Sequence, residues 1–520
     1  MRDRRGSAGG ALAALALLVA GGAAMAAQTK QAPYTLQVQS RVVLTDVSVT
    51  DKHGQPVQGL TQSDFTILDN GRPQKIASFE EHRQPAEEMP VSAAANAPGV
   101  FSNSYLTHPP AVVNVILIDA TTIRIVDQMY LYEQMQHFVA KLPAGESTAV
   151  FDRRGDSALE LQTFTSDHDL LMKAVRKAIP YPRRPGAWMA SDYDTLIQMA
   201  TYLAQVPGRK NLLWFTGGSN LYLSLDPTDA ATAASMQPIY DMLEAERIAL
   251  YPIDARGLTV GFSMAMGAQH MQMDQEAGAT GGHAYFNTNG LALAAQHVLD
   301  TDGSYYTLTY PPDDLRVDGR WHKVRVRLRE GDYQLSYRRG YFDDGGGAPK
   351  TPNVGPGQTP PMRTVLRADG SKVQVPQDQS IPIVFEAQVL PATGVSTANG
   401  AKPPKRGESA YVVRYELPAK EIYPATVAGN EAKDKMGTAE LAFDRYGEAV
   451  ARRMEQVSFE VNQTVEQAVA HPVVRFDQPV NLRWGDDYLL AAVWDETSGR
   501  MGMVSMEVNV PKPPRHGAAK

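Results

Sequence analysis

Three side chains follow one another along the chain in the order used by serine hydrolases. Ser219 and Asp254 each follow a short apolar run, and His283 comes later. In an α/β-hydrolase such residues serve as nucleophile, carboxylate and general base. The nucleophile there stands in a Gly-x-Ser-x-Gly turn, whose glycines keep a strained elbow free of side chains, whereas Leu221 stands two residues after Ser219. We therefore keep a serine hydrolase that uses Ser219, Asp254 and His283 only as an alternative function.

The composition excludes several other classes of site. The 520 residues include no cysteine, which excludes disulfides, thiolate metal ligands, a cysteine nucleophile and a lipid-bearing cysteine. The 11 histidines form no His-Glu-x-x-His pair of the kind that binds zinc. The formal charge of −7 at pH 7 argues against nucleic acid as a partner, because a polyanion would be repelled.

The first 26 residues have the features of a secretory signal peptide. Three arginines near the start are followed by an apolar stretch rich in Ala and Leu, and Ala24-Met25-Ala26 matches the Ala-x-Ala rule for cleavage. The apolar stretch is shorter than the roughly 20 residues that span a bilayer, and no later stretch reaches that length. We therefore expect removal of residues 1–26, leaving a mature chain without a transmembrane segment, in the periplasm or outside the cell.

The centre of the chain alternates short apolar runs with longer amphipathic stretches. The runs that indicate strands are 112–118, 148–152, 159–164, 211–215, 249–253 and 283–286. The first intervening helix is expected to face the sheet with apolar side chains spaced by about three or four residues, namely Ile125, Met129, Tyr132, Met135, Phe138 and Leu142. Such alternation is typical of a doubly wound, mostly parallel α/β sheet, which we predict over residues 111–302.

Strand-like alternation occurs on both sides of this α/β region. Residues 34–82 contain alternating apolar residues and an Asn70-Gly71 turn of the type that closes a hairpin. Residues 303–342 show the same alternation. Because neither segment has enough strands for a core of its own, we expect the two to pair into a β-sandwich that the α/β domain interrupts.

Composition divides the remaining chain into linkers and a third domain. Residues 83–110 are rich in Pro, Ala and Ser and are predicted to be a linker, as is the Gly- and Pro-rich segment 343–380. Residues 381–511 contain several strand-like runs and are predicted to form a β-sandwich of immunoglobulin-like size. Residues 512–520 are expected to be a disordered tail.

Several short phrases mark residues 34–342. They are Val49-Thr50-Asp51-Lys52-His53-Gly54, Pro207-Gly208-Arg209-Lys210-Asn211-Leu212, Tyr251-Pro252-Ile253-Asp254-Ala255-Arg256 and Tyr337-Arg338-Arg339-Gly340-Tyr341-Phe342. In their order along the chain they resemble the von Willebrand factor A family, in particular its acidobacterial secreted branch. The resemblance implies a Rossmann-like central domain that binds other proteins.

The same resemblance implies a degenerate metal site. Family members hold a divalent cation at the carboxyl ends of the strands, with oxygen ligands from Asp-x-Ser-x-Ser, a loop threonine and Thr-Asp-Gly. Here the first motif is Asp119-Ala120-Thr121-Thr122-Ile123 and the last is Thr216-Gly217-Gly218, so that Ile and Gly replace two donors. The ligand set that remains is Asp119, Thr121, Ser191 and Thr216. This set implies at most a weakly bound Mg²⁺ or Ca²⁺ ion and no other cofactor, and Asp119 could instead cap its turn.

These observations favour a secreted, non-enzymatic protein-interaction protein acting in adhesion or as a scaffold. Its partners are expected to be proteins of the cell envelope or the extracellular space. The loops expected to contact them contain Asp119, Thr121, Thr216, Gly217, Gly218 and Asp254. Besides the serine hydrolase, a purely structural component of the cell envelope is the second alternative.

Overall fold

The computed structural model describes residues 42–512, apart from intervening segments. Those segments are 84–98, 108–109, 156, 180–191, 219–229, 259–262, 314–319, 343–361, 367–371, 377–381, 393–402, 419–420, 422–425, 429–430, 462–472 and 496–499. The predicted signal peptide, Ser191, Ser219 and residues 513–520 lie outside the described residues. Among the helices that are described, none is long and apolar enough to cross a membrane.

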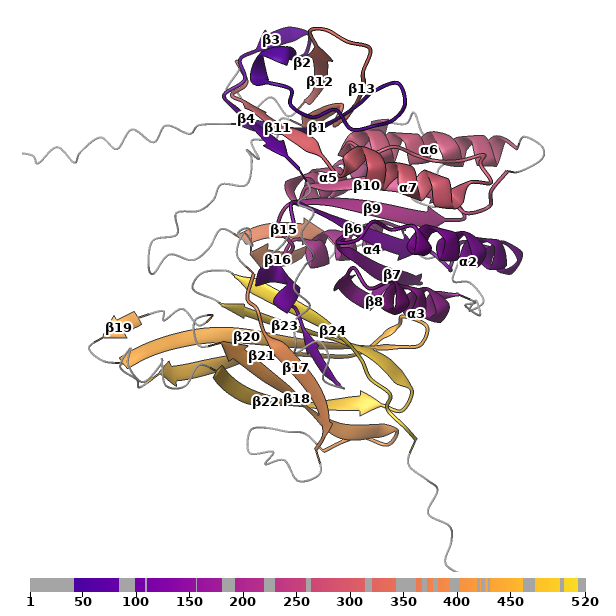
Figure 1. Ribbon diagram of the computed structural model, residues 1–520. Coiled ribbons are helices and arrows are strands. Elements are labelled where there is room, and N and C mark those ends of the chain that lie inside the picture. Colours follow the sequence, from indigo (N-terminus) through magenta and orange to yellow (C-terminus); the bar gives the residue numbers. More distant parts are fainter. Residues whose placement is uncertain are drawn as a thin grey trace, which may run out of the picture. The chain divides into compact units, whose positions relative to one another are not determined.

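The centre of the chain forms a five-stranded sheet in the order β8-β7-β6-β9-β10 (Figure 1). The strands are β6 (Val112–Ile118), β7 (Thr148–Arg154), β8 (Ser157–Thr165), β9 (Arg209–Thr216) and β10 (Ile248–Asp254). All neighbours are parallel except β8, which forms an antiparallel edge beside β7. The prediction of a mostly parallel α/β sheet is therefore confirmed.

The strand predicted at 283–286 is wrong. Its residues make a single parallel bridge, between Ile253 and Tyr285. Gly281 ends the preceding helix in the left-handed conformation, and Asn287 has a positive φ of 54°. The chain therefore turns on both sides of Tyr285, and too few extended residues remain for a strand.

Helices cover both faces of this sheet (Figure 1). They are α2 (Ile125–Ala140), α3 (His168–Ala178), α4 (Asp192–Leu203), α5 (Ala230–Ala245), α6 (Met264–Thr280) and α7 (Leu291–Asp302). On β9, Leu213 and Phe215 pack with α2, α3 and α7, whereas Leu212 and Trp214 pack with α4 and α5. Successive residues of the strand thus point into the cores on opposite faces of the sheet, which is the arrangement of a doubly wound sheet.

Helix α2 buries only the later part of the predicted stripe. Met135, Phe138 and Leu142 are buried together with Leu131, but Ile125 and Met129 are each 60% exposed. The stripe therefore meets the sheet only after the first turns of the helix. The expectation that Ile125 and Met129 face the core is therefore wrong.

The strands before and after the α/β domain pair with one another. The first sheet, β13-β1-β11-β4, contains β1 (Val43–Thr50), β4 (Ser78–His82), β11 (Tyr305–Tyr310) and β13 (Gln334–Tyr337). The second, β14-β12-β2-β3, contains β2 (Phe65–Asp69), β3 (Arg72–Gln74), β12 (Trp321–Leu328) and β14 (Gly340–Phe342). Val47, Ile67, Tyr306, Leu308 and Val326 share one buried core, so the two chain segments form one module.

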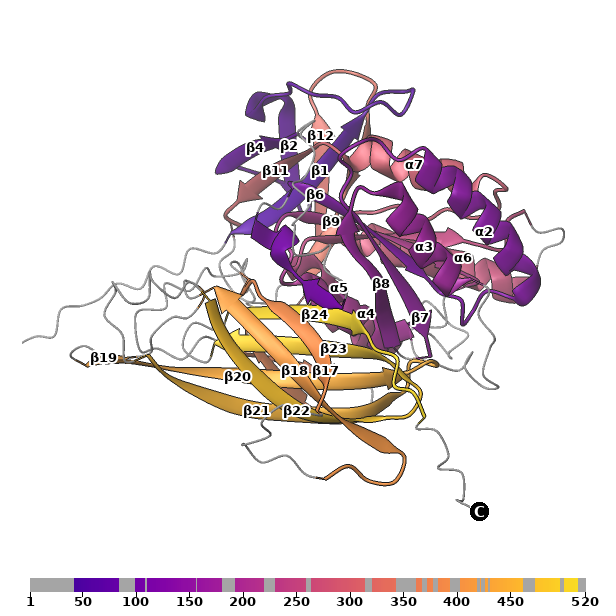
Figure 2. The ribbon, with the colours of Figure 1, turned by 60° about the horizontal axis from the view of Figure 1, so that its bottom comes forward.

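The C-terminal region forms a second pair of antiparallel sheets (Figure 2). One has the order β22-β18-β17-β5 and contains β17 (Glu386–Pro391), β18 (Glu408–Pro418) and β22 (Val473–Arg483). The other contains β19 (Thr426–Ala428), β20 (Glu431–Asp444), β21 (Ala449–Val461), β23 (Asp486–Asp495) and β24 (Met501–Glu507). Within the predicted linker 343–380, β15 (Met362–Leu366) and β16 (Lys372–Pro376) pair as a hairpin.

The interpretation of residues 83–110 as a linker alone is wrong. Strand β5 (Val100–Ser102) adds to β17 of the C-terminal sheet, and a 3₁₀ turn follows at Ser104–Thr107. The buried side chain of Asn103 donates to the carbonyl of Ile383 at 2.9 Å and accepts from the amide of Phe385 at 2.9 Å. A strand of three residues shows no alternation, so its pairing with residues almost 300 positions away could not be predicted.

We expect Asn103→Ala to destabilise the C-terminal sandwich by about 2 kcal/mol. The substitution removes two hydrogen bonds and leaves a buried carbonyl and a buried amide without those partners. Urea denaturation followed by hydrogen exchange on β17 measures the change. Thr107→Ala, in the same segment but at an exposed side chain, is the matched control and should change little. An equal effect of both variants would contradict a specific role of Asn103.

Candidate functional site

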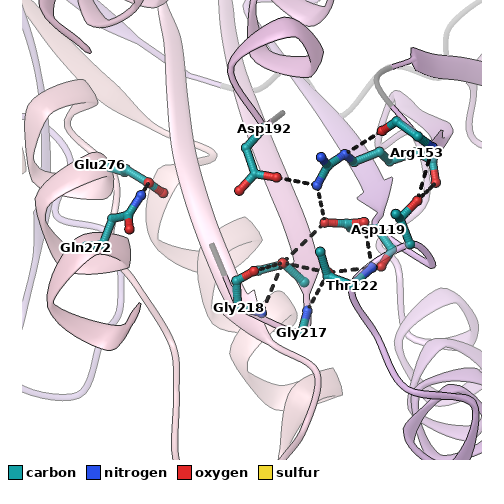
Figure 3. A network of polar contacts seen from close by, with 11 residues as sticks. Asp119, Thr122, Arg153, Asp192, Gly217, Gly218, Gln272 and Glu276 are labelled. Atoms are coloured by element: carbon teal, nitrogen blue, oxygen red, sulfur yellow. Dashed lines mark hydrogen bonds and ion pairs between the residues drawn. The ribbon is translucent and has the colours of Figure 1, made fainter. Parts of the chain in front are cut away.

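The carboxyl ends of β6 and β9 bring two of the predicted site residues together. The hydroxyl of Thr216, the last residue of β9, donates to Oδ2 of Asp119 at 3.3 Å. The amide of Gly217 donates to the hydroxyl of Thr122 at 2.9 Å, and that hydroxyl lies 3.1 Å from Thr216 Oγ1 (Figure 3). Because neighbouring parallel strands end at one edge of a sheet, these loops meet there.

A guanidinium group that the sequence analysis missed completes this cluster. Nη1 of Arg153 lies 2.8 Å from Asp119 Oδ2, and the same nitrogen forms an ion pair with Asp192 at the start of α4 (Figure 3). The side chains of Asp119, Arg153 and Asp192 are all 0% exposed. We refer to these three residues as the buried charge triad.

Arg153 reaches the site because β7 is longer than predicted. The apolar pattern ends at Asp152, and Asp152-Arg153-Arg154 has the composition of a solvated strand end. In the structure β7 continues to Arg154, and all three charged residues are buried. The signal that could have found the triad is this pair of arginines at the carboxyl end of one strand, together with Asp119 at the carboxyl end of another.

The two carboxylates of the triad affect the pKa of its guanidinium. Burial alone would lower the pKa of Arg153, but Asp119 and Asp192 outweigh it and raise the pKa above its ordinary value. Next to the triad, burial raises the pKa of Asp152 to about 7, although its ion pair with Arg154 at 2.7 Å opposes the rise. The negative charge of the site is therefore balanced chiefly by arginine side chains.

The remaining predicted ligands are engaged with the protein. Thr121 is buried and donates to the backbone carbonyl of Arg153 at 3.0 Å, so it fastens the end of β7. The other oxygen of Asp119, Oδ1, accepts from the amide of Thr122 at 3.2 Å. Ile123, at the third position of the motif, packs in the core against the sheet. Ser191 lies outside the described residues.

These residues do not fit a divalent cation. The guanidinium of Arg153 already lies against the Asp119 oxygen that a cation would need, and Thr216 donates to the same oxygen. An octahedral Mg²⁺ site also requires several free oxygen donors. Within the part of the chain that the structure describes, no three His, Asp or Glu side chains are grouped so that they could hold a metal ion.

Gly217 stands where the resemblance would place a second carboxylate, and the surrounding backbone leaves no room for a side chain there. A Cβ atom on this residue would lie 2.5 Å from the carbonyl oxygen of Thr122 and 3.0 Å from the amide nitrogen of Ile123. Both atoms belong to the backbone and cannot rotate away. The loop after β6 therefore closes against β9 in a way that leaves room only for glycine at this position.

Asp254, at the end of β10, forms a separate cluster. Its carboxylate accepts from Arg256 at 2.8 Å and lies 2.8 Å from Nε2 of His270, whose ring stacks on Phe286. Burial would raise the pKa of Asp254, but the hydrogen bonds from Arg256 and His270 outweigh it and lower the pKa below its ordinary value. Asp254 is therefore ionised and neutralised at neutral pH.

The structure does not bring Asp254 and His283 together. Tyr285 is level with Ile253, so His283 lies two residues earlier along β10, away from its carboxyl end. His283 is exposed and contacts the ring of Tyr285 edge to face. The imidazole beside Asp254 belongs to His270, and Ser219 lies outside the described residues. The carboxylate and base of the hydrolase alternative are therefore not assembled.

The comparisons with known proteins concern the fold. No family model and no curated protein matches the chain. Solved structures similar to it include the SpRpn10 VWA domain, at 15% identity and a TM-score of 0.25, over 37% of this chain and 96% of that one. The human COPII-coat protein Sec24c is similar at 9% identity and a TM-score of 0.25, over 45% and 44% of the two chains.

The pilus adhesin SpaC from Lactobacillus rhamnosus GG, in an open conformation, is similar at 9% identity and a TM-score of 0.27, over 83% of this chain and 56% of that one. The chain thus spans about half the length of Sec24c and of SpaC. Similarity at this level says nothing about activity or partners. What the structure itself establishes is a mixed α/β chain whose buried charge triad stands at the carboxyl edge of a largely parallel sheet.

Proposed function

We propose that the chain is a secreted, non-enzymatic protein-interaction protein, acting as an adhesin or scaffold, with the α/β domain as its recognition domain. We further propose that this domain belongs to the von Willebrand factor A family and to its acidobacterial secreted branch. The observation that carries the binding role is a group of exposed apolar side chains at the carboxyl end of the parallel sheet.

This group, which we call the apolar rim, comprises Ile125, Val126, Met129, Leu258 and Leu293. Val126 is 73% exposed and Leu293 is 67% exposed. The rim residues come from the first turns of α2 and α7 and from the loop after β10. They therefore surround the same edge of the sheet as Asp119, Thr216 and Asp254.

Hydrogen bonds tie the three segments of the rim together. The amide of Leu258 donates to Oδ1 of Asn289 at 2.9 Å, and the hydroxyl of Tyr130 on α2 donates to the carbonyl of the same asparagine. The amide of Ala292 on α7 donates to Gln134 of α2 at 3.3 Å. The rim is therefore one local surface, held in place before any partner arrives.

The clustering of these side chains is what points to a partner. Five of the twelve exposed large apolar side chains in the described residues belong to the rim. Single exposed apolar residues are common on any protein, whereas a group on one fixed surface is typical of an interaction site. A purely structural envelope component has no need of such a surface.

The chemistry at the same edge supports binding rather than catalysis. The buried charge triad is closed to solvent, and Asp254 is neutralised by Arg256. A catalytic group must reach its substrate, so neither cluster is arranged as a nucleophile or an exposed base.

The test is capture of an envelope or secreted protein by the immobilised mature chain. The double variant Val126→Asp with Leu258→Asp should reduce capture tenfold or more, because central apolar contacts commonly contribute over 1 kcal/mol each. Val126 lies in the first turn of α2, where an aspartate favours the helix, so folding should be preserved. The control is Val473→Asp, the same substitution at an exposed valine of β22.

Equal capture by the rim variant and the wild type would contradict the proposed surface. Labelling of Ser219 by a fluorophosphonate probe, with loss of labelling in Ser219→Ala, would instead establish the hydrolase alternative. Loss of capture in Val473→Asp alone would move the binding site to the C-terminal sandwich.

A further inference from the structure

The two carboxylates of the buried charge triad need a positive charge close to them. Asp119 and Asp192 are both fully buried, and each contacts the same nitrogen of Arg153. Two carboxylates enclosed in a protein repel each other and lose their hydration, so they need positive charge between them. In this chain the positive charge comes from a residue of β7.

Arg153 is also fixed in place from its other side. Its Nε donates to the carbonyl of Gly155 at 3.1 Å, and its own carbonyl accepts from Thr121 at 3.0 Å. The guanidinium group therefore contacts the carbonyl of Gly155, just after β7, and both carboxylates. Since arginine stays charged at every physiological pH, this cation cannot be lost by deprotonation.

We infer that the guanidinium of Arg153 is a covalently attached replacement for a divalent cation, which makes the carboxyl edge of the α/β domain independent of metal ions. Asp119 and Thr216, the two residues that the resemblance implied as metal ligands, both belong to its surroundings. The guanidinium joins the loop after β6 to the start of α4, and Thr216 of β9 bonds the same oxygen of Asp119. The inference concerns the domain itself and does not depend on the proposed partner.

The decisive test is whether removal of Arg153 creates a metal site. Arg153→Ser would leave Asp119, Asp192 and Thr216 around a vacated space, together with the new hydroxyl. Such oxygen donors suit Mg²⁺ and Mn²⁺. Melting temperatures are measured for the mature wild type and the variant in EDTA, Mg²⁺, Mn²⁺ and Ca²⁺.

We expect the wild type to melt at the same temperature in all four conditions. Arg153→Ser should melt lower in EDTA and gain several degrees in Mg²⁺ or Mn²⁺, because a ligand of the native state raises stability. Adding Asp119→Asn to Arg153→Ser should abolish the gain. Arg153→Lys, which keeps a positive charge at the site, should stay insensitive to the ions.

Two results would overturn the inference. One is a cation-dependent rise in the wild type that Asp119→Asn removes. The other is a folded Arg153→Ser protein that responds to no cation. If Arg153→Ser does not fold in EDTA, recovery of its circular dichroism in Mn²⁺ counts as the gain. If Arg153→Ser folds in no buffer, the double variant Arg153→Ser with Asp192→Asn is tested instead, because it buries one carboxylate rather than two. The same melting measurements then decide.

Discussion

Arg153→Met is expected to destabilise the α/β domain by about 3–5 kcal/mol, the range found when one partner of a buried ion pair is removed. Methionine fills a similar volume but carries no charge, so Asp119 and Asp192 would remain buried without a counter-ion. Because the chain has several modules, the change is best measured locally, from hydrogen exchange of the β6 and β9 amides in increasing urea.

Two controls separate charge balance from packing. Arg124→Met removes a surface ion pair in which the arginine is 63% exposed, and it should cost well under 1 kcal/mol. The triple variant Asp119→Asn, Asp192→Asn and Arg153→Met removes all three charges and should recover part of the loss. If Arg153→Met costs no more than Arg124→Met, the guanidinium does not balance the buried carboxylates.

Gly217→Asp is expected to destabilise the protein by about 1–3 kcal/mol and to create no metal site. The substitution introduces the carboxylate that the sequence resemblance would place at this position. Its Cβ would meet the carbonyl oxygen of Thr122 at 2.5 Å, so the loop after β6 would have to shift. Thermal unfolding with EDTA or Mg²⁺ measures both the loss and any effect of the ion.

Gly217→Ala carries the same Cβ without the charge and should show most of the same loss. Gly290→Ala is the matched control: its Cβ would lie 3.3 Å from a terminal methyl of Leu293, which can rotate away. Because Gly290 is also the N-cap residue of α7, the expected loss is that of a helix cap, below about 1 kcal/mol. Stabilisation of Gly217→Asp by Mg²⁺ would show that the loop opens and that the site accepts a metal after all.

Much of the central fold could be predicted from local patterns. Apolar runs separated by helical periods predicted the α/β sheet, since strand and helix periods are properties of a few consecutive residues. The same patterns could not show that β5 joins the C-terminal sheet. They also could not show that Ile125 and Met129 at the start of α2 are exposed, because both residues fit the same helical spacing as the buried Met135 and Phe138.

The site was predicted only in part. The resemblance implied Asp119 and Thr216 as neighbours at the carboxyl edge of the sheet. It did not indicate Arg153 or Asp192, because charged residues at the end of a strand or the start of a helix are usually solvated. His283 was assigned a place beside Asp254 from chain order alone, whereas the neighbouring imidazole is that of His270.

The sequence by itself determined most of the elements and the absence of cysteine chemistry, and its resemblance to a known family implied an incomplete set of metal ligands. Only the tertiary structure decided what surrounds Asp119: two buried carboxylates, one after β6 and one at the start of α4, meet one arginine from β7. The physical reason is that burial and charge pairing depend on contacts between residues far apart in the chain. A short motif therefore cannot show which distant side chain meets a buried carboxylate.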